Sequence, residues 1–301
     1  MSLLAMILAA QQSAGPAPTP ADPRPPAPDE HTAIIRPSGR VIFTANLAPD
    51  GSGDYPTITA AIAAARTAQA DRMKADGFAT VTPDFACQFI LDPGTYDECI
   101  QHPPPFSAFY GAGRDVTIVR GKQDDTNSRG IHESAGRVYV EGLTLRRTVA
   151  GSGGQSVYPV HANNQGTTIY AWCHLDNEAG GTWYGMDGNR NGFLYLYQTK
   201  GTGSGTNLHG WAGMDSRQTI AFIGVTSTGP IGYGADSTDV MDVWVKDTTA
   251  PKLSVTGAST STHVSRSTIP TITVTGAQDT RSDHPVPVGG LSPHDRAHYG
   301  M

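Results

Sequence analysis

Cysteine is scarce in this chain of 301 residues, and so are charged residues. The three cysteines are Cys87, Cys99 and Cys173, and no two of them form a Cys-x-x-Cys pair. The sequence therefore offers neither a disulfide framework nor a cysteine metal site. We expect all three to be small, buried apolar side chains. A bond between Cys87 and Cys99, on neighbouring strand-like segments, is the alternative.

Charged residues make up 16% of the chain, the net charge is −6, and no block is rich in Lys or Arg. A protein that binds a phosphate backbone needs clustered cations, so we expect no nucleic-acid partner. The apolar run at residues 3–10 is too short to span a bilayer as a helix, so we expect no membrane span.

Metal and cofactor motifs are also missing. His132, His161, His174 and His209 share no His-x-x-x-His spacing and have no carboxylate at a fixed ligand distance. The glycine-rich segment 201–206 lacks the lysine and the strand-to-helix context of a phosphate-binding loop. We predict no metal and no cofactor, with histidines satisfied by their neighbours.

Glycine is abundant, at 35 residues, and a short pattern recurs among the turns. Each copy is an aromatic or apolar patch, a small residue and often Asp, with a β-rich segment a few residues later. The copies cover residues 129–133, 158–162, 183–187, 211–215 and 232–236, and their ends are 29, 25, 28 and 21 residues apart. Repeats of this length are typical of stacked units that bury a core only together.

These repeats have no helices between them, so the predicted fold is all-β: a single-stranded parallel β-helix. Residues 1–40 form an extended, proline-rich N-terminal arm, and residues 41–276 form the β-helix. Within it, the apolar stripe of Ile58, Ala61, Ile62 and Ala65 predicts a capping helix over 57–74 that covers the exposed first coil. Residues 277–301 are predicted to be an irregular C-terminal tail.

Two groups of side chains are candidate site residues. Stacked repeats place equivalent positions about 4.8 Å apart, so Asp187 and Asp215 would lie in a carboxylate column with Asp236. Paired carboxylates are the machinery of glycoside hydrolysis. The alternatives are turn carboxylates that accept backbone N–H bonds, or a cation site.

The second group is aromatic: Trp183, Tyr184, Trp211 and Tyr233 are candidates for stacking on sugar rings. The alternative is an interior aromatic stack. Because adjacent strand residues point to opposite faces, one of Trp183 and Tyr184 is expected outside.

The first half of the β-helix resembles the pectinesterases and other pectin-lyase-like β-helix proteins. The resemblance rests on residues 50–58 (DGSGDYPTI) before an alanine-rich helix, 92–98 (DPGTYDE), 110–113 (YGAG) and 140–145 (VEGLTL), and it covers about residues 41–175. It implies the right-handed parallel β-helix fold.

The catalytic motifs of that family are not found. Where its Gln-Asp-Thr motif is expected, residues 177–184 read NEAGGTWY, and its second Asp motif is replaced by TNLHGW at 206–211. Residues 243–247 (VWVKD) only partly match a lyase motif. We therefore lean against an enzyme.

The sequence favours a structural or host-attachment subunit, namely a spike, fibre or decoration protein of a bacteriophage or phage-like particle. The resemblance to β-helical tail spikes implies contact with cell-surface polysaccharide. We expect a homo-oligomer in the virion or another extracellular particle, in which the arm anchors on other subunits through Leu3, Leu4, Ile7 and Leu8. The alternatives are a secreted polysaccharide hydrolase or lyase that uses Asp187 and Asp215, and a bacterial surface adhesin.

Overall fold

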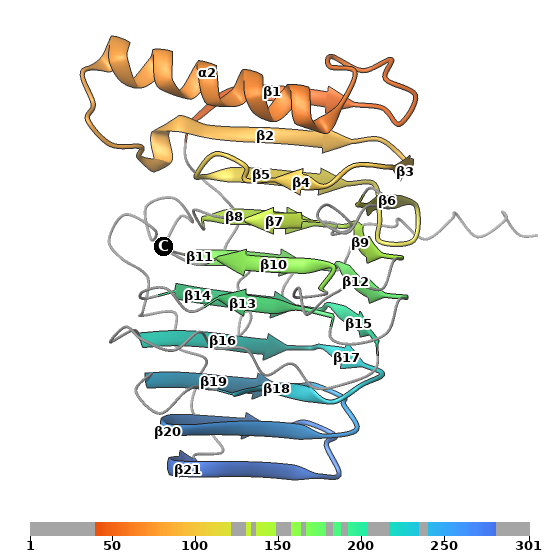
Figure 1. The fold of residues 1–301 in the computed structure, drawn as a ribbon, viewed down its shortest axis with the longest axis vertical. Coiled ribbons are helices and arrows are strands. Elements are labelled where there is room, and N and C mark those ends of the chain that lie inside the picture. Colours follow the sequence, from red (N-terminus) through yellow and green to blue (C-terminus); the bar gives the residue numbers. More distant parts are fainter. Residues whose placement is uncertain are drawn as a thin grey trace, which may run out of the picture.

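The computed structural model describes residues 40–121, 131–133, 137–148, 158–163, 167–178, 183–187, 192–203, 217–234 and 240–280. Almost all regular structure in these ranges is short strands stacked into a tall column, with one α-helix at its N-terminal end (Figure 1). Every strand pair in it is parallel. A short 3-10 helix, Pro83–Phe85, precedes β2.

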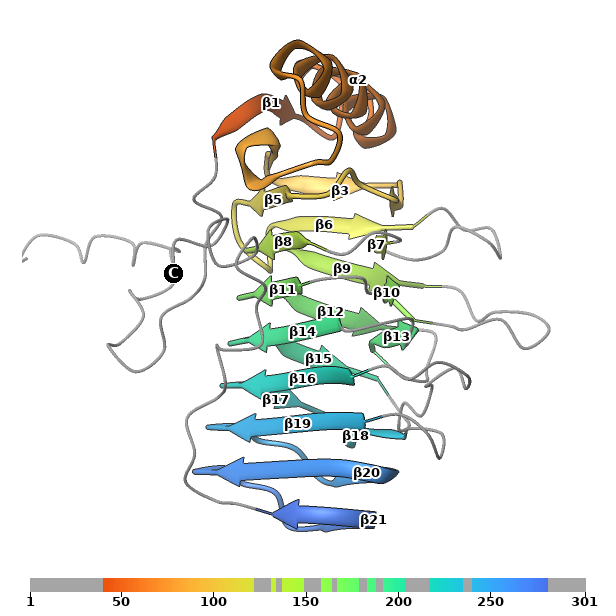
Figure 2. The same cartoon turned by 90° about the vertical axis from the view of Figure 1, so that its left-hand side faces the viewer.

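The column is built from three parallel sheets, of which sheet A runs its whole length and sheets B and C cover part of it (Figure 2). Sheet A contains β1 (Val41–Leu47), β2 (Ala86–Leu91), β5 (Ser107–Gly111), β8 (Val138–Glu141), β11 (Thr167–Ala171), β14 (Gly192–Tyr197), β16 (Arg217–Ile223), β19 (Val240–Lys246), β20 (Leu253–Ser265), β21 (Ile272–Thr280) and β18 (Ile231–Gly234), which pairs with β20. Sheet B contains β3 (Gly94–Tyr96), β6 (Thr117–Arg120), β9 (Thr144–Arg147), β12 (His174–Asn177), β15 (Lys200–Thr202) and β17 (Thr226–Ser227). Sheet C contains β4 (Ile100–Gln101), β7 (Ile131–Glu133), β10 (Val160–Asn163) and β13 (Gly185–Asp187).

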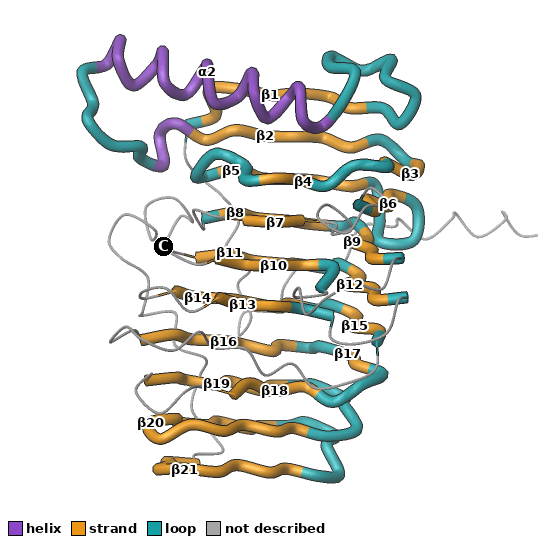
Figure 3. Tube along the Cα trace, viewed as in Figure 1, coloured by secondary structure: helices purple, strands orange, loops and turns teal. Residues whose placement is uncertain are grey.

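The chain visits the sheets in the order A, B, C and then returns to A one strand further along, as β5, β6, β7 and then β8 illustrate (Figure 3). Parallel strands joined in this way wind right-handed in nearly all proteins. The fold is thus a single-stranded, right-handed parallel β-helix, as predicted. Its last strand, β21, continues to Thr280, past the predicted boundary at residue 276.

The corner between sheets A and B is the same tight turn in successive coils. Its first residue has a positive φ, and its N–H donates to a carbonyl in the next coil, as in Trp172 N to Tyr197 O at 2.9 Å and Gln198 N to Ile223 O at 2.8 Å. The residues at this position are Gly142, Trp172, Gln198, Gly224, Asp247 and Arg266. The repeated hydrogen bond holds even residues with bulky side chains in the left-handed backbone conformation that glycine adopts most readily.

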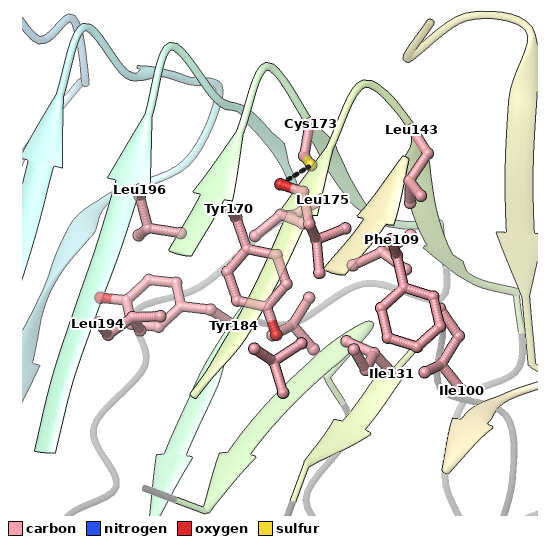
Figure 4. Packing of buried hydrophobic residues seen from close by; sticks show 14 of the residues in the cluster. Ile100, Phe109, Ile131, Leu143, Tyr170, Cys173, Leu175, Tyr184, Leu194 and Leu196 are labelled. Atoms are coloured by element: carbon pink, nitrogen blue, oxygen red, sulfur yellow. Dashed lines mark hydrogen bonds between the residues drawn. The ribbon is translucent and has the colours of Figure 1, made fainter. Parts of the chain in front are cut away.

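The interior is filled by every second residue of each strand. In sheet A the inward column contains Phe89, Phe109, Val140, Tyr170, Leu196, Phe222 and Val245, all buried in one cluster. The rings of Phe89 and Phe109 stack with centroids 4.5 Å apart. Part of this interior, including Phe109, Tyr170 and Leu196, is shown in Figure 4.

All three cysteines are buried thiols that form no disulfide bond, which confirms the prediction that they are small core residues. Cys173 lies just after the corner residue, at the turn position that Thr199 fills one coil later. Its Sγ is 3.5 Å from the carbonyl oxygen of Val140 in the preceding coil, and the Thr199 hydroxyl donates to Tyr170 O at 3.0 Å. Burial raises the pKa of the Cys173 thiol to about 12, so it stays protonated.

The register between coils confirms one predicted repeat alignment and corrects another. Glu133 pairs with Ala162, as the repeat spacing predicts. Ala162 pairs with Met186, however, so Asp187 pairs with Asn163, one residue from its predicted position. A shift of one residue moves a side chain to the other face of a strand.

The predicted capping helix is α2 (Ile58–Asp76), which lies across the first coil (Figure 1). Thr57 begins it, with its hydroxyl accepting from Ala60 N at 3.0 Å. The Glu98 carboxylate accepts from the N–H groups of Ile58 and Thr59, each at 3.1 Å, and so satisfies donors that a helix start leaves unpaired. Ile58, Ala61, Ile62 and Ala65 are all buried against the coil.

Replacing Ile62 by Asp should destabilise the protein by about 3 kcal/mol or more, because a carboxylate would be buried in an apolar seam without a partner. Ala63→Asp, at an exposed position of the same helix, is the matched control and should change stability by less than about 1 kcal/mol. Urea unfolding measures both. Equal midpoints for the two variants would show that this helix face does not cap the coil.

Candidate functional site

The outer face of sheet B carries a connected array of polar side chains. Along its strands the inward positions are apolar or small, as in Leu145, Leu175 and Gly201. Alternation then turns Arg146, Asp176 and Thr202 outward, and the strand register places these three side by side.

The side chains of this array bond to one another. Arg146 Nε donates to Asp176 Oδ2 at 2.9 Å and lies 3.1 Å from Glu178 Oε1. The Thr202 hydroxyl donates to the other oxygen of Asp176, Oδ1. His174 Nε2 is 3.0 Å from Thr202 Oγ1. Both carboxylate oxygens of Asp176 are therefore occupied.

The electrostatics of the array keep His174 neutral near pH 7. Burial is the main cause that lowers the pKa of His174, and the cations Lys200 and Arg146 lower it further, while Asp176 opposes them. The hydroxyl of Thr202 donates its hydrogen bond to Asp176. The Nε2 of His174 is therefore protonated and donates a hydrogen bond to the Thr202 oxygen.

A histidine, a hydroxyl and a carboxylate are the elements of nucleophilic catalysis, but that chemistry needs a bare imidazole nitrogen facing the hydroxyl proton. Here the proton of Thr202 points to Asp176 instead. Only about a tenth of each side chain is exposed, 10% for His174 and 11% for Asp176. The array as it stands locks neighbouring coils together.

An exposed ion pair lies nearer the N-terminal end of the same face. Arg120 holds Asp97 in two hydrogen bonds, one of them from Nη2 to Oδ2 at 3.2 Å. This partner holds the pKa of the Asp97 carboxyl below its usual value. The Asp97 side chain is 65% exposed, so the pair lies in solvent and is screened.

Trp183 and Tyr184 were expected to place one ring outside, and this prediction is wrong: both are buried, at 0% and 1% exposure. Trp183 Nε1 donates to Ser227 Oγ at 3.0 Å, and the Tyr184 hydroxyl bonds to both backbone groups of Gly232. A Cβ on Gly201 would come within 2.2 Å of Trp183 Cε2, so this glycine makes room for the indole. Strand alternation does not apply to the pair because β13 begins only at Gly185.

The other predicted site residues are placed in part or not at all. Asp187 lies in β13 and Tyr233 in β18, where the structure describes their backbones only. Trp211, Asp215, Asp236, Leu3, Leu4, Ile7 and Leu8 lie outside the described residues. The structure thus does not test the carboxylate column.

Within the described ranges, no three His, Cys, Asp or Glu side chains gather in a way that would hold a metal ion. In the same ranges no helix combines the length and the apolar character that crossing a bilayer requires.

Sequence analysis missed the array on sheet B. Its strands are two to four residues long, too short for alternation to be recognised. The one usable signal was His174-Leu175-Asp176 directly after a strand: two polar residues flank one apolar residue, which is typical of a half-buried strand.

Comparison with known proteins identifies no sequence relative of the chain. No protein-family model matches the chain, and neither does any curated protein. Among solved structures, it is similar to pectin methylesterase from carrot, with a TM-score of 0.42 and 12% sequence identity over 88% of each chain.

Replacing Asp176 by Ala should destabilise the protein by about 1–3 kcal/mol, because Thr202 loses its acceptor and the half-buried Arg146 keeps one carboxylate instead of two. Asp97→Ala removes an exposed ion pair and serves as the matched control, with an effect of less than about 1 kcal/mol. Thermal and urea unfolding give both values. If the two variants are equally stable, the array does not hold the coils together.

Stability should also depend on the protonation of His174. Since the pKa of His174 is lowered in the folded state from its ordinary value of 6.5, the unfolded chain binds a proton there before the folded chain does. The free energy of unfolding should therefore fall as the pH drops from about 7 to about 5. His174→Gln should reduce this slope; the same slope in both proteins would assign the pH dependence to other groups.

Proposed function

We propose that the protein is a structural, host-attachment subunit of a bacteriophage or phage-like particle: a rigid β-helical spike, fibre or decoration protein that touches cell-surface polysaccharide. The observation that carries this proposal is the state of the polar array on sheet B. Its carboxylate, imidazole and hydroxyl bond to one another, which suits a surface that stabilises the fold better than a reactive one.

The same face suits contact with a polysaccharide. A second outward column runs through Thr144, His174, Lys200 and Thr226, in register across four strands of sheet B. Thr144 and His174 are buried, and they bond to Arg114 O and to Thr202. Lys200 and Thr226 reach solvent on neighbouring strands, and their ammonium and hydroxyl groups would bond to the hydroxyls of a sugar chain.

The N-terminal arm would anchor the subunit in its particle. Residues 14–29 contain seven prolines, and the apolar run 3–10 precedes them. A segment of this composition buries too little surface to fold by itself, but it can extend across a neighbouring subunit. We propose that Leu3, Leu4, Ile7 and Leu8 pack against another copy or another particle protein.

The enzyme alternative depends on Asp187 and Asp215, one coil apart. Asp215 lies outside the described residues, so this pair stays a prediction. Among the described residues, the His174, Thr202 and Asp176 side chains bond to one another, and this is what favours the structural role.

Deleting residues 1–29 should leave the β-helix folded, because its first strand begins at Val41, but should prevent incorporation into the assembled particle. Circular dichroism tests folding, and co-sedimentation with particles tests incorporation. Leu4→Asp with Ile7→Asp in the full chain should have the same effect, whereas Ser2→Asp with Ser13→Asp, also in the arm, should assemble normally.

Assembly of the deleted form at wild-type yield would contradict the anchoring role. Cleavage of a polysaccharide by the purified protein, abolished by Asp187→Asn, would instead support the secreted enzyme.

A further inference from the structure

The last described coil of the column leaves its core open. Ile272, the first residue of β21, continues an inward column whose preceding members are Ile231 and Leu253. Both preceding side chains are 0% exposed, whereas Ile272 is 48% exposed. Val274 and Ile269 pack against the core from the same coil and are only half-buried. The exposed fraction thus rises where a further coil would lie.

We call this surface the open end and define it by Ile269, Ile272 and Val274. Strand β21 has an open edge on the same side, because among the described strands it pairs with β20 alone. The backbone N–H and C=O groups along such an edge can pair with a further strand. The open end therefore offers both an apolar surface and a row of hydrogen-bonding groups.

The sequence of the last described coil favours strand pairing. Residues 271–275 read Thr-Ile-Thr-Val-Thr, and all of them are β-branched, the residue class that is enriched in strands. No charged residue or histidine occurs over 267–278. Charged side chains are a common protection of an edge strand against association, and this part of β21 lacks them. Two copies of this end can also approach each other without repulsion between like charges.

The opposite end of the column does not offer a matching surface. There α2 lies across the first coil and buries Ile58, Ala61 and Ile62 against it (Figure 1). A second copy that stacked head to tail would have to displace this helix, whose start is also held by Glu98. Head-to-tail contacts generate rings or filaments, and α2 blocks such contacts here. The matching surface is therefore the open end of another copy.

We propose that the open end joins a second copy of this chain tail to tail, with the two β21 strands antiparallel across a two-fold axis. Each β21 would supply hydrogen-bonding groups to the open edge of the other. Ile269, Ile272 and Val274 of both copies would be removed from water together. Because both copies use the same surface, the contact closes and the assembly stops at a dimer.

The dimer would be a single rod with a helix cap at each end. From β1 to β21 the column spans nine strand spacings, about 43 Å. The two α2 helices would therefore lie more than about 90 Å apart, whereas the two β21 strands would lie about 5 Å apart. Such a dimer would form whether or not the protein belongs to a particle.

The mass of the purified full chain in solution tests the contact. Light scattering coupled to size exclusion should give twice 31.7 kDa for the wild type at micromolar concentration. Ile272→Lys places a charge in the contact and should give the mass of one chain. Val116→Lys is the matched control and should remain a dimer, because Val116 is also 48% exposed but lies between β5 and β6. A monomeric wild type, or the same mass for both variants, would overturn the proposal.

Spin labels test the tail-to-tail arrangement in a protein that keeps Ile272. A nitroxide attached to Thr273→Cys, at an exposed position of β21, should show strong dipolar coupling to its counterpart in the second copy. The same label on Ala63→Cys, at an exposed position of α2, should show none, because the two helices would lie more than about 90 Å apart. The native cysteines are buried and do not take up the label. No coupling at Thr273, or coupling at Ala63, would contradict the proposal.

Discussion

Register between coils is the constraint on which the rest of this structure depends. Each strand pairs in parallel with the equivalent strand one turn later. Residues at equivalent positions of successive coils therefore lie about 4.8 Å apart, one above the other. Inward positions become a continuous column such as Phe89 and Phe109, and outward positions become rows such as Arg146 beside Asp176. No coil buries its residues alone, so stability is shared between neighbouring coils.

At each end of the column the terminal coil has no neighbour on one side, which would expose its core and its backbone groups. At the N-terminal end α2 covers the first coil, and the N–H groups at the start of this helix are satisfied by Thr57 and by Glu98 from the first coil. The cap and the coil thus stabilise each other. Towards the other end the strands lengthen: β20 spans 13 residues and pairs with both β18 and β19.

The repeat period and the lack of intervening helices sufficed to predict the fold, and a stripe of four apolar residues sufficed to predict α2. The sites could not be predicted as well, because coil length varies. The register partner of Ala162 is Met186, one residue earlier than the repeat predicts, so Asp187 lies opposite Asn163. The repeat period alone does not reveal such a shift. Trp183 and Tyr184 precede their strand, so alternation gave the wrong face for one of them. In sheet A both faces are apolar, as in Val138–Glu141, so the sequence does not show which side chains point inward and which point outward.

The three faces of the solenoid therefore differ in what they can contact. Sheet A is apolar on its outer side as well, and Tyr139 and Tyr195 there are buried. Sheet B is polar on its outer side, where Arg146, Asp176 and Thr202 stand in register and Lys200 and Thr226 reach solvent. Because the coils fix these groups relative to one another, little conformational entropy would be lost when a long polar ligand aligns with them. If the proposed function is right, a polysaccharide would therefore meet sheet B rather than sheet A.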